Sequence, residues 1–230
     1  MERRSHVAGP LERALRELWQ SARHRLWQPQ YWGRHLQLRR RYDLRPLRLA
    51  RLRLRVPPGL VPDCDACEEV CCTGRTRVVT LRLLDVARLV DVGLESHISR
   101  ERPQFTVAEL DGNPALRDRV ASDLWRWSPV LTQDRTATCT LLDANLGCRA
   151  YPAWPLSCAR FPYSVNFAAG TIFYAPSCRS TRIAQRDEAP APARALVVAA
   201  VDCYNEQIRD LVLLHVARAE LEQLGLLRFL

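Results

Sequence analysis

The 230-residue chain contains no lysine, so all 34 of its basic side chains other than histidine are arginines. We interpret this as a coding bias, since a functional need for guanidinium groups would not remove every lysine. No apolar stretch approaches the roughly eighteen residues of a transmembrane helix. The N-terminus lacks the apolar core and cleavage site of a secretory signal, and Arg3-Arg4 precedes no apolar segment of the twin-arginine type. These absences predict a cytoplasmic protein, soluble or peripheral to a membrane.

Several catalytic signatures are also missing from the sequence. There is no glycine-rich phosphate loop, no H-E-x-x-H motif and no nucleotide-binding fingerprint. Their absence argues against ordinary dehydrogenase or ATPase chemistry. The chain also shows no evident internal repeat. Its length is sufficient to bury a proper core, so any bound metal need not be its only source of stability.

What the chain does have is nine cysteines, eight of them in two clusters. The clusters comprise Cys64, Cys67, Cys71 and Cys72, and then Cys139, Cys148, Cys158 and Cys178. In a reducing cytosol, clustered thiols indicate metal binding or catalysis more than stable disulfides. Thiolates bind soft and borderline metals, so these eight residues are the candidate metal ligands.

The spacing of the cysteines leaves the type of metal site open. Cys64 and Cys67 form a C-x2-C knuckle, and the adjacent Cys71 and Cys72 are expected to point in different directions and to serve different metal positions. The gaps in the second cluster are longer and fit loops stiffened by proline. Eight thiolates would fill two tetrahedral zinc sites, whereas four could hold a [4Fe-4S] cluster and leave the others structural or reactive.

The order of these cysteines and their neighbours resembles the YkgJ-type cysteine-cluster family, described as a zinc- or iron-chelating domain. The similarity covers about residues 60–182 and rests on the first cluster, the segment 80–89, Cys139-Thr-Leu-Leu-Asp143, Cys148-Arg-Ala-Tyr151, the segment 154–162 and Cys178. The chain differs in having three residues, 68–70, where the family usually has two. The resemblance implies a metal-chelating module. Some relatives resemble flagellin lysine methylases that depend on an iron–sulfur cluster, which implies a group-transfer enzyme as the alternative.

The positive charge is concentrated in the N-terminal quarter. Residues 1–55 contain fifteen arginines and four acidic residues, a net charge of +11, whereas the remaining residues carry −2. Three tryptophans, Trp19, Trp27 and Trp32, are interspersed among these arginines. Arginines together with tryptophans could bind an anionic partner, either nucleic acid or a membrane surface. The alternative, which we favour, is a solvated basic face on a helix that packs against its own domain.

Periodicity predicts a mainly helical α+β protein in three parts. These are a basic amphipathic arm at 1–57, a metal-stabilised cysteine-cluster domain with a β-hairpin at 58–188, and a C-terminal helix at 189–230 that packs on this domain. Helices are expected at 11–26, 81–92, 115–127 and 197–224, a short helix after a capping box at Thr106, a strand at 47–56, a hairpin at 163–174 and a stiff linker at 189–193. Thr80 is the expected N-cap of the second helix.

Four other residues are weaker candidates for a functional role. Cys203 lies beside the apolar stripe of the C-terminal helix and is expected to be a buried, inert thiol. His97 could replace a missing metal ligand, although a surface or packing role is the first expectation. Asp85 and Arg88 share a helical face, where we expect an ion pair or a capping network near the site.

Overall fold

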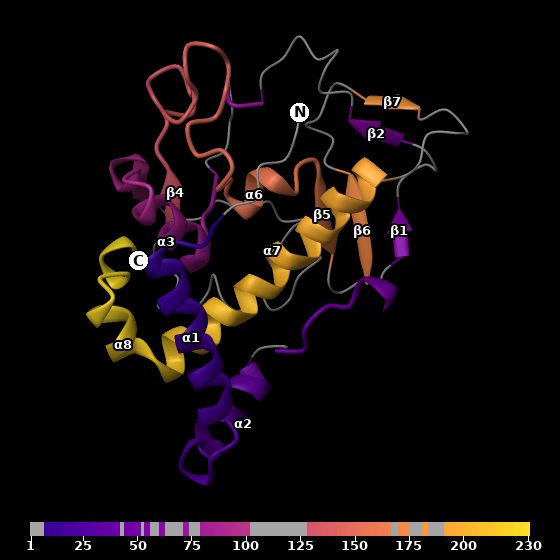
Figure 1. The fold of residues 1–230 in the computed structure, drawn as a ribbon. Coiled ribbons are helices and arrows are strands. Elements are labelled where there is room, and N and C mark those ends of the chain that lie inside the picture. The colour runs from indigo at the N-terminus through magenta and orange to yellow at the C-terminus, as the bar shows by residue number, and fades with distance from the viewer. Residues whose placement is uncertain are drawn as a thin grey trace.

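The computed structural model describes residues 7–41, 44–51, 53–55, 60–62, 71–73, 79–101, 128–166, 170–174, 181–183 and 191–230. Within them the chain is a mixed α and β protein that is mainly helical, as predicted (Figure 1). The α-helices are α1 (Pro10–Arg25), α2 (Trp32–Arg41), α3 (Leu83–Asp91), α6 (Leu156–Ala159), α7 (Ala191–Val216) and α8 (Arg218–Gln223). The 3-10 helices are η1 (Pro29–Tyr31), η2 (Leu49–Arg51), η3 (Glu95–His97) and η5 (Leu227–Phe229). None of the described helices is long and apolar enough to span a bilayer.

The described strands are short and form three small sheets. They are β1 (Arg53–Arg55), β2 (Leu60–Pro62), β3 (Ile98–Glu101), β4 (Ser128–Leu131), β5 (Tyr163–Asn166), β6 (Thr171–Tyr174) and β7 (Thr181–Ile183). The largest sheet has the order β1-β6-β5, in which β5 and β6 form the predicted antiparallel hairpin. The β1 strand pairs in parallel with β6, with Leu54 opposite Ile172. The pairs β2-β7 and β3-β4 are antiparallel.

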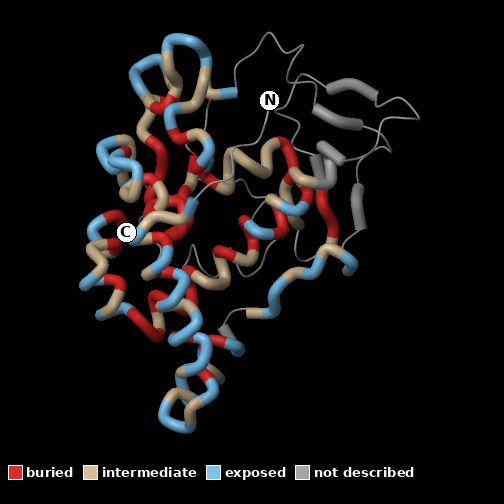
Figure 2. Tube along the Cα trace, viewed as in Figure 1, coloured by how far each residue is buried: buried red, intermediate tan, exposed pale blue. Residues whose placement is uncertain are grey.

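Helix α7 links the two buried parts of the molecule. Its first half covers the β5-β6 hairpin, where Val197 and Val201 pack with Tyr163 and Ile172. Its second half joins α1, α3 and α8 around a larger core that includes Leu89 and other buried residues (Figures 1 and 2). The apolar stripe predicted for 11–26 therefore packs against the body, with Leu15 and Ala22 buried. The same larger core borders the cysteines described below.

The first turn of α1 is capped by a residue of α3, 80 positions away in sequence. The carboxylate of Asp91 accepts hydrogen bonds from the backbone N–H groups of Leu11, at 2.9 Å, and Glu12, at 2.8 Å. The first N–H groups of a helix have no partner within the helix, and its N-terminus favours an anion. A Cβ atom on Gly9 would lie 2.3 Å from Asp91 Cγ, so glycine permits this close approach. The contact fixes α1 to α3.

Four expected element boundaries differ from the structure. The helix after Thr80 begins at Leu83 with Arg82 as its N-cap, because Asp85 Oδ2 accepts the Arg82 backbone N–H at 2.8 Å. The predicted single helix at 197–224 is two helices that meet at Ala217, which has a non-helical backbone. Helix α7 begins at Ala191, within the expected linker 189–193. The described part of the expected strand at 47–56 consists of η2 and β1. The predicted helix at 115–127 and the capping box at Thr106 lie outside the described residues.

Candidate metal centre

Two tandem turns end on Cys139 and Cys148. In the first, the Asp134 N–H donates to the Thr138 carbonyl at 2.9 Å, and in the second the Asp143 N–H donates to the Gly147 carbonyl at 2.9 Å. In each turn the aspartate Oδ1 also accepts two backbone N–H groups from inside the turn, at 2.8 to 3.0 Å. Each turn therefore closes through its own bonds and ends at a cysteine.

The two turns form a nine-residue structural repeat, which the sequence analysis missed. Each turn has a left-handed residue two positions before its cysteine, Ala137 with φ 59° and Leu146 with φ 61°. The available signal was the pair of segments Asp-x-Thr-x-Thr-Cys at 134–139 and Asp-x-Asn-x-Gly-Cys at 143–148. An aspartate followed by small polar residues at alternate positions is typical of side-chain-closed turns. The gap between these cysteines, which appeared too long for a knuckle, is filled by the second turn.

One backbone hydrogen bond joins the two cysteine clusters. The N–H of Cys139 donates to the carbonyl oxygen of Cys72 at 2.8 Å, although 67 positions separate these residues. Cys72, Cys148 and Cys158 are partly buried and pack against the larger core, to which the buried Cys139 itself belongs. Four of the eight predicted ligands, two of them directly bonded through the backbone, therefore line one core. Cys71 is exposed whereas Cys72 is half-buried.

Cys158 is positioned by a short helix that α3 holds in place. The backbone N–H of Leu156, the first residue of α6, donates to Asp85 Oδ1 at 2.9 Å. The hydroxyl of Ser157 donates to the Thr80 carbonyl at 2.7 Å. Asp85 thus belongs to the predicted capping network and also connects α3 to the segment that carries Cys158. Arg88 forms its ion pair with Glu12 of α1, at 3.1 Å.

The electrostatic environment of Cys148 disfavours a thiolate in the absence of a cation. Burial raises the pKa of the Cys148 thiol, the backbone N–H groups of Ala150 and Tyr151 lower it, and the negative charges of the Cys139 thiolate and Asp143 raise it further. Cys139, Cys148 and Cys203 are thiols rather than halves of disulfides.

Cys64, Cys67 and Cys178 lie outside the described residues. Among the residues that the structure describes, no three His, Cys, Asp or Glu side chains form a group that could hold a metal ion. Cys203 is buried on α7, with the Arg82 Nη2 and Ser157 Oγ atoms each 4.0 Å from its sulfur. Its position matches the expected buried thiol.

His97 acts as a brace between the two turns. Its Nδ1 lies 2.8 Å from the hydroxyl of Thr140, which donates to the Thr132 carbonyl, so Nδ1 carries the proton. Its Nε2 accepts from Arg149 at 3.3 Å. Thr140 follows Cys139 and Arg149 follows Cys148. Since both ring nitrogens already have partners, the geometry favours a positioning role for His97 over the metal-ligand role considered from the sequence.

The lowered pKa of His97 predicts a loss of folding stability at low pH that depends on this residue. Burial and then the charge of Arg149 lower the pKa of His97 from its ordinary value of 6.5. The unfolded chain therefore binds this proton more readily, so the contribution of His97 is complete above pH 6.5 and is lost as the pH falls through the folded pKa. Urea unfolding at pH 7.5 and pH 5 should show a smaller pH dependence for His97→Gln than for the wild type. Equal pH dependence in the two proteins would contradict this role.

Comparison of the chain with protein-family models, with curated proteins and with solved structures finds no match.

Proposed function

We propose that the chain is a metal-chelating cysteine-cluster protein that binds zinc or iron through Cys64, Cys67, Cys71, Cys72, Cys139, Cys148, Cys158 and Cys178. The observation that supports this most directly is the hydrogen bond from the Cys139 N–H to the Cys72 carbonyl. This bond brings the backbones of Cys72 and Cys139, one residue from each cluster, side by side. A metal site shared by the two clusters requires that they approach each other, and this contact meets that requirement.

The chemistry of the donor set fits a soft or borderline cation. All eight donors are thiols, which favour zinc, copper(I) or iron–sulfur clusters over magnesium or calcium. Several thiolates gathered beside an apolar core repel one another and lose solvation, and a bound cation offsets both costs. Each tandem turn closes through its own hydrogen bonds and presents a cysteine at its end, as a metal knuckle does. When bound, zinc would crosslink the two distant chain segments, whereas an iron–sulfur cluster would also supply redox or group-transfer chemistry.

Substitution of one buried cysteine should test this proposal. Anaerobically purified wild-type protein is expected to contain zinc or iron by elemental analysis, and Cys139→Ser is expected to lose most of that metal. Cys203→Ala is the matched control, because Cys203 is also a buried thiol but lies on α7 outside the ligand set. It should retain the wild-type metal content.

The outcome also distinguishes the two forms of the proposal. A brown protein that absorbs at about 400 nm indicates an iron–sulfur cluster and favours the group-transfer enzyme. A colourless protein that contains zinc favours a non-catalytic binding module. Wild-type protein without bound metal after anaerobic purification, or equal metal content in Cys139→Ser and Cys203→Ala, would refute the proposed site.

A further inference from the structure

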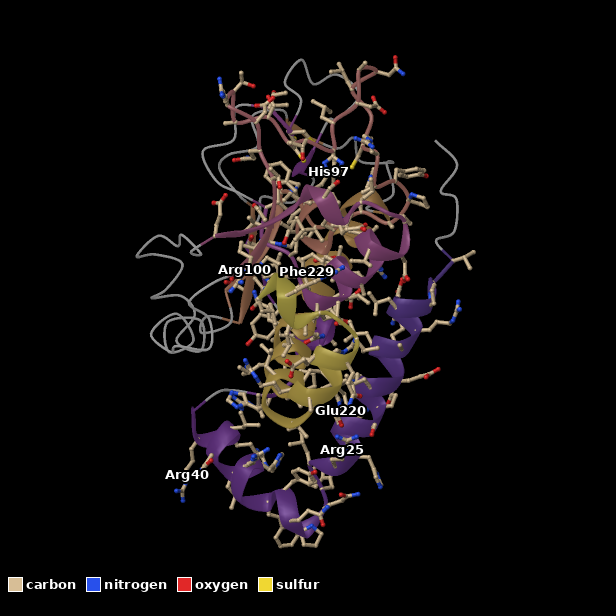
Figure 3. All side chains as sticks on the ribbon, turned by 90° about the vertical axis from the view of Figure 1, so that its left-hand side faces the viewer. Arg25, Arg40, His97, Arg100, Glu220 and Phe229 are labelled. Carbon is tan, nitrogen blue, oxygen red and sulfur yellow. The ribbon has the colours of Figure 1, made fainter. Side chains whose placement is uncertain are left out.

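A helical tip projects from the body of the molecule. We define the helical tip as residues 23–41, which comprise the end of α1, the turn η1 and helix α2 (Figure 1). Leu38 of α2 is buried in the larger core and anchors the tip. Arg25 forms an ion pair with Glu220 of α8 (Figure 3). Arg34 donates to the His215 carbonyl at 3.4 Å. These contacts hold the tip in a defined orientation while its outer face stays exposed.

Large apolar side chains lie on this outer face. Trp27 is 67% exposed, Trp32 is 57% exposed and Leu36 is 56% exposed. Trp32 and Leu36 are four residues apart on α2, so they occupy the same face of the helix, one turn apart. Trp27 precedes α2 and its ring lies 5.4 Å from that of His35. A cluster of large exposed apolar side chains on one projecting element is typical of an interaction site.

The charge around this apolar stripe has one sign. No acidic residue occurs between Glu17 and Asp43. On α2, Arg39 and Arg40 are exposed and lie seven and eight positions after Trp32, which places them beside the apolar stripe. Arg23, at the end of α1, is also exposed. The partner of this face must therefore be apolar in part and negatively charged.

We propose that the helical tip binds the surface of an anionic lipid membrane. Leu36 distinguishes this partner from single-stranded nucleic acid, because an aliphatic side chain offers no stacking surface for a base but inserts readily at the boundary of the acyl chains. The indole Nε1–H of Trp32 donates to the Trp27 carbonyl at 3.3 Å, so Trp32 can leave water without losing its hydrogen bond. Arginines beside tryptophan and leucine on a short helix match the interfacial class of membrane-binding helix, which lies on a bilayer and does not cross it.

Sedimentation of the full-length protein with lipid vesicles tests this proposal. Vesicles of equimolar phosphatidylcholine and phosphatidylglycerol should bind the protein, and vesicles of phosphatidylcholine alone should not. Arg39→Gln/Arg40→Gln is expected to lower the partition coefficient about 25-fold, since each arginine near an anionic surface contributes about fivefold. Trp32→Ser/Leu36→Ser removes the apolar stripe and is also expected to abolish most of the binding.

Matched controls separate the tip from the total charge of the protein. Arg135→Gln/Arg218→Gln removes two exposed arginines from a loop and from α8, and Val92→Ser/Val198→Ser removes two exposed apolar side chains away from the tip. Both controls should bind like the wild type. The four variants change exposed residues, and equal melting temperatures would confirm that they fold.

Three results would overturn the proposal. The first is failure of the wild type to bind anionic vesicles. The second is equal weakening in the tip variants and their controls, which would indicate non-specific attraction of a basic protein. The third is binding of a fluorescent oligouridylate that depends on Trp32 and Leu36 in the absence of vesicle binding, which would assign the tip to nucleic acid.

Discussion

Chelation of the metal is expected to unfold or loosen residues 60–182 of a zinc-bound protein. If zinc joins the two cysteine clusters, its binding free energy contributes directly to folding, and in small zinc domains this amounts to about 10 to 16 kcal/mol. The total stability of a domain is only about 5 to 15 kcal/mol, so even partial loss of this contribution is severe. Here the larger core contains many buried side chains outside the cysteine clusters and should retain part of the structure.

We therefore expect the melting temperature to fall by roughly 10 to 20 °C, the shift that a loss of about 5 kcal/mol produces in a protein of this size. Circular dichroism would measure the transition, and limited proteolysis would locate the loosened segment. Cleavage should concentrate within 60–182, while α7 and α8 stay protected for longer. Readdition of zinc should restore the transition. An unchanged melting curve for the metal-stripped protein would mean that metal does not connect the clusters.

Asp85→Ala is expected to have the second largest effect, on stability and on metal content together. The carboxylate accepts one backbone N–H from Arg82 and one from Leu156, and its side chain is almost fully buried. Burial raises the pKa of Asp85 and the two N–H donors lower it, so these bonds help to keep the carboxylate ionised. The alanine variant leaves one buried and one partly buried N–H donor without this partner, at about 1 to 3 kcal/mol each. We expect a loss of about 3 kcal/mol in urea unfolding.

The second readout is metal bound per chain. Because Asp85 fixes the start of α6, its loss should let Cys158 move and lower the metal content. Asp91→Ala is the matched control, since Asp91 also accepts two backbone N–H groups but at the start of α1. That variant should lose about 1 to 2 kcal/mol of stability and retain its metal. Equal loss of metal in both variants would show that Asp85 acts through general stability alone.

The elements that could be predicted from the sequence are those whose signals are local. The apolar period at 11–26 predicted α1 to within one residue at each end, and the turn at Gly170 placed the β5-β6 hairpin. The boundary at Ala217 could not be predicted, because the apolar residues recur at helical intervals on both sides of it. The helix start at Leu83 also depends on Asp85, whose carboxylate accepts the N–H of Arg82 with one oxygen and the N–H of the distant Leu156 with the other.

The parts of the candidate site that could not be predicted depend on contacts between distant residues. The cysteines were identifiable by type and order, but their spacing says nothing about which members meet. In the site, the hydrogen bond between Cys139 and Cys72 joins segments about 70 positions apart. In the fold, the cap that Asp91 provides to α1 joins segments 80 positions apart, and the parallel pairing of β1 with β6 joins segments about 120 positions apart. Such pairings follow from the whole fold and leave no periodic pattern in either segment.

The self-contained bonding of the tandem turns suggests an order of assembly. Closing a loop of five residues costs little chain entropy and proceeds in well under a microsecond, whereas bringing Cys72 to Cys139 requires closure of a loop more than ten times longer. We therefore expect the turns that carry Cys139 and Cys148 to form before the first cluster reaches them. A metal ion that binds these two thiols early would shorten the time needed to join the clusters. The supply of metal during synthesis would then affect the rate of folding as well as the stability of the folded protein.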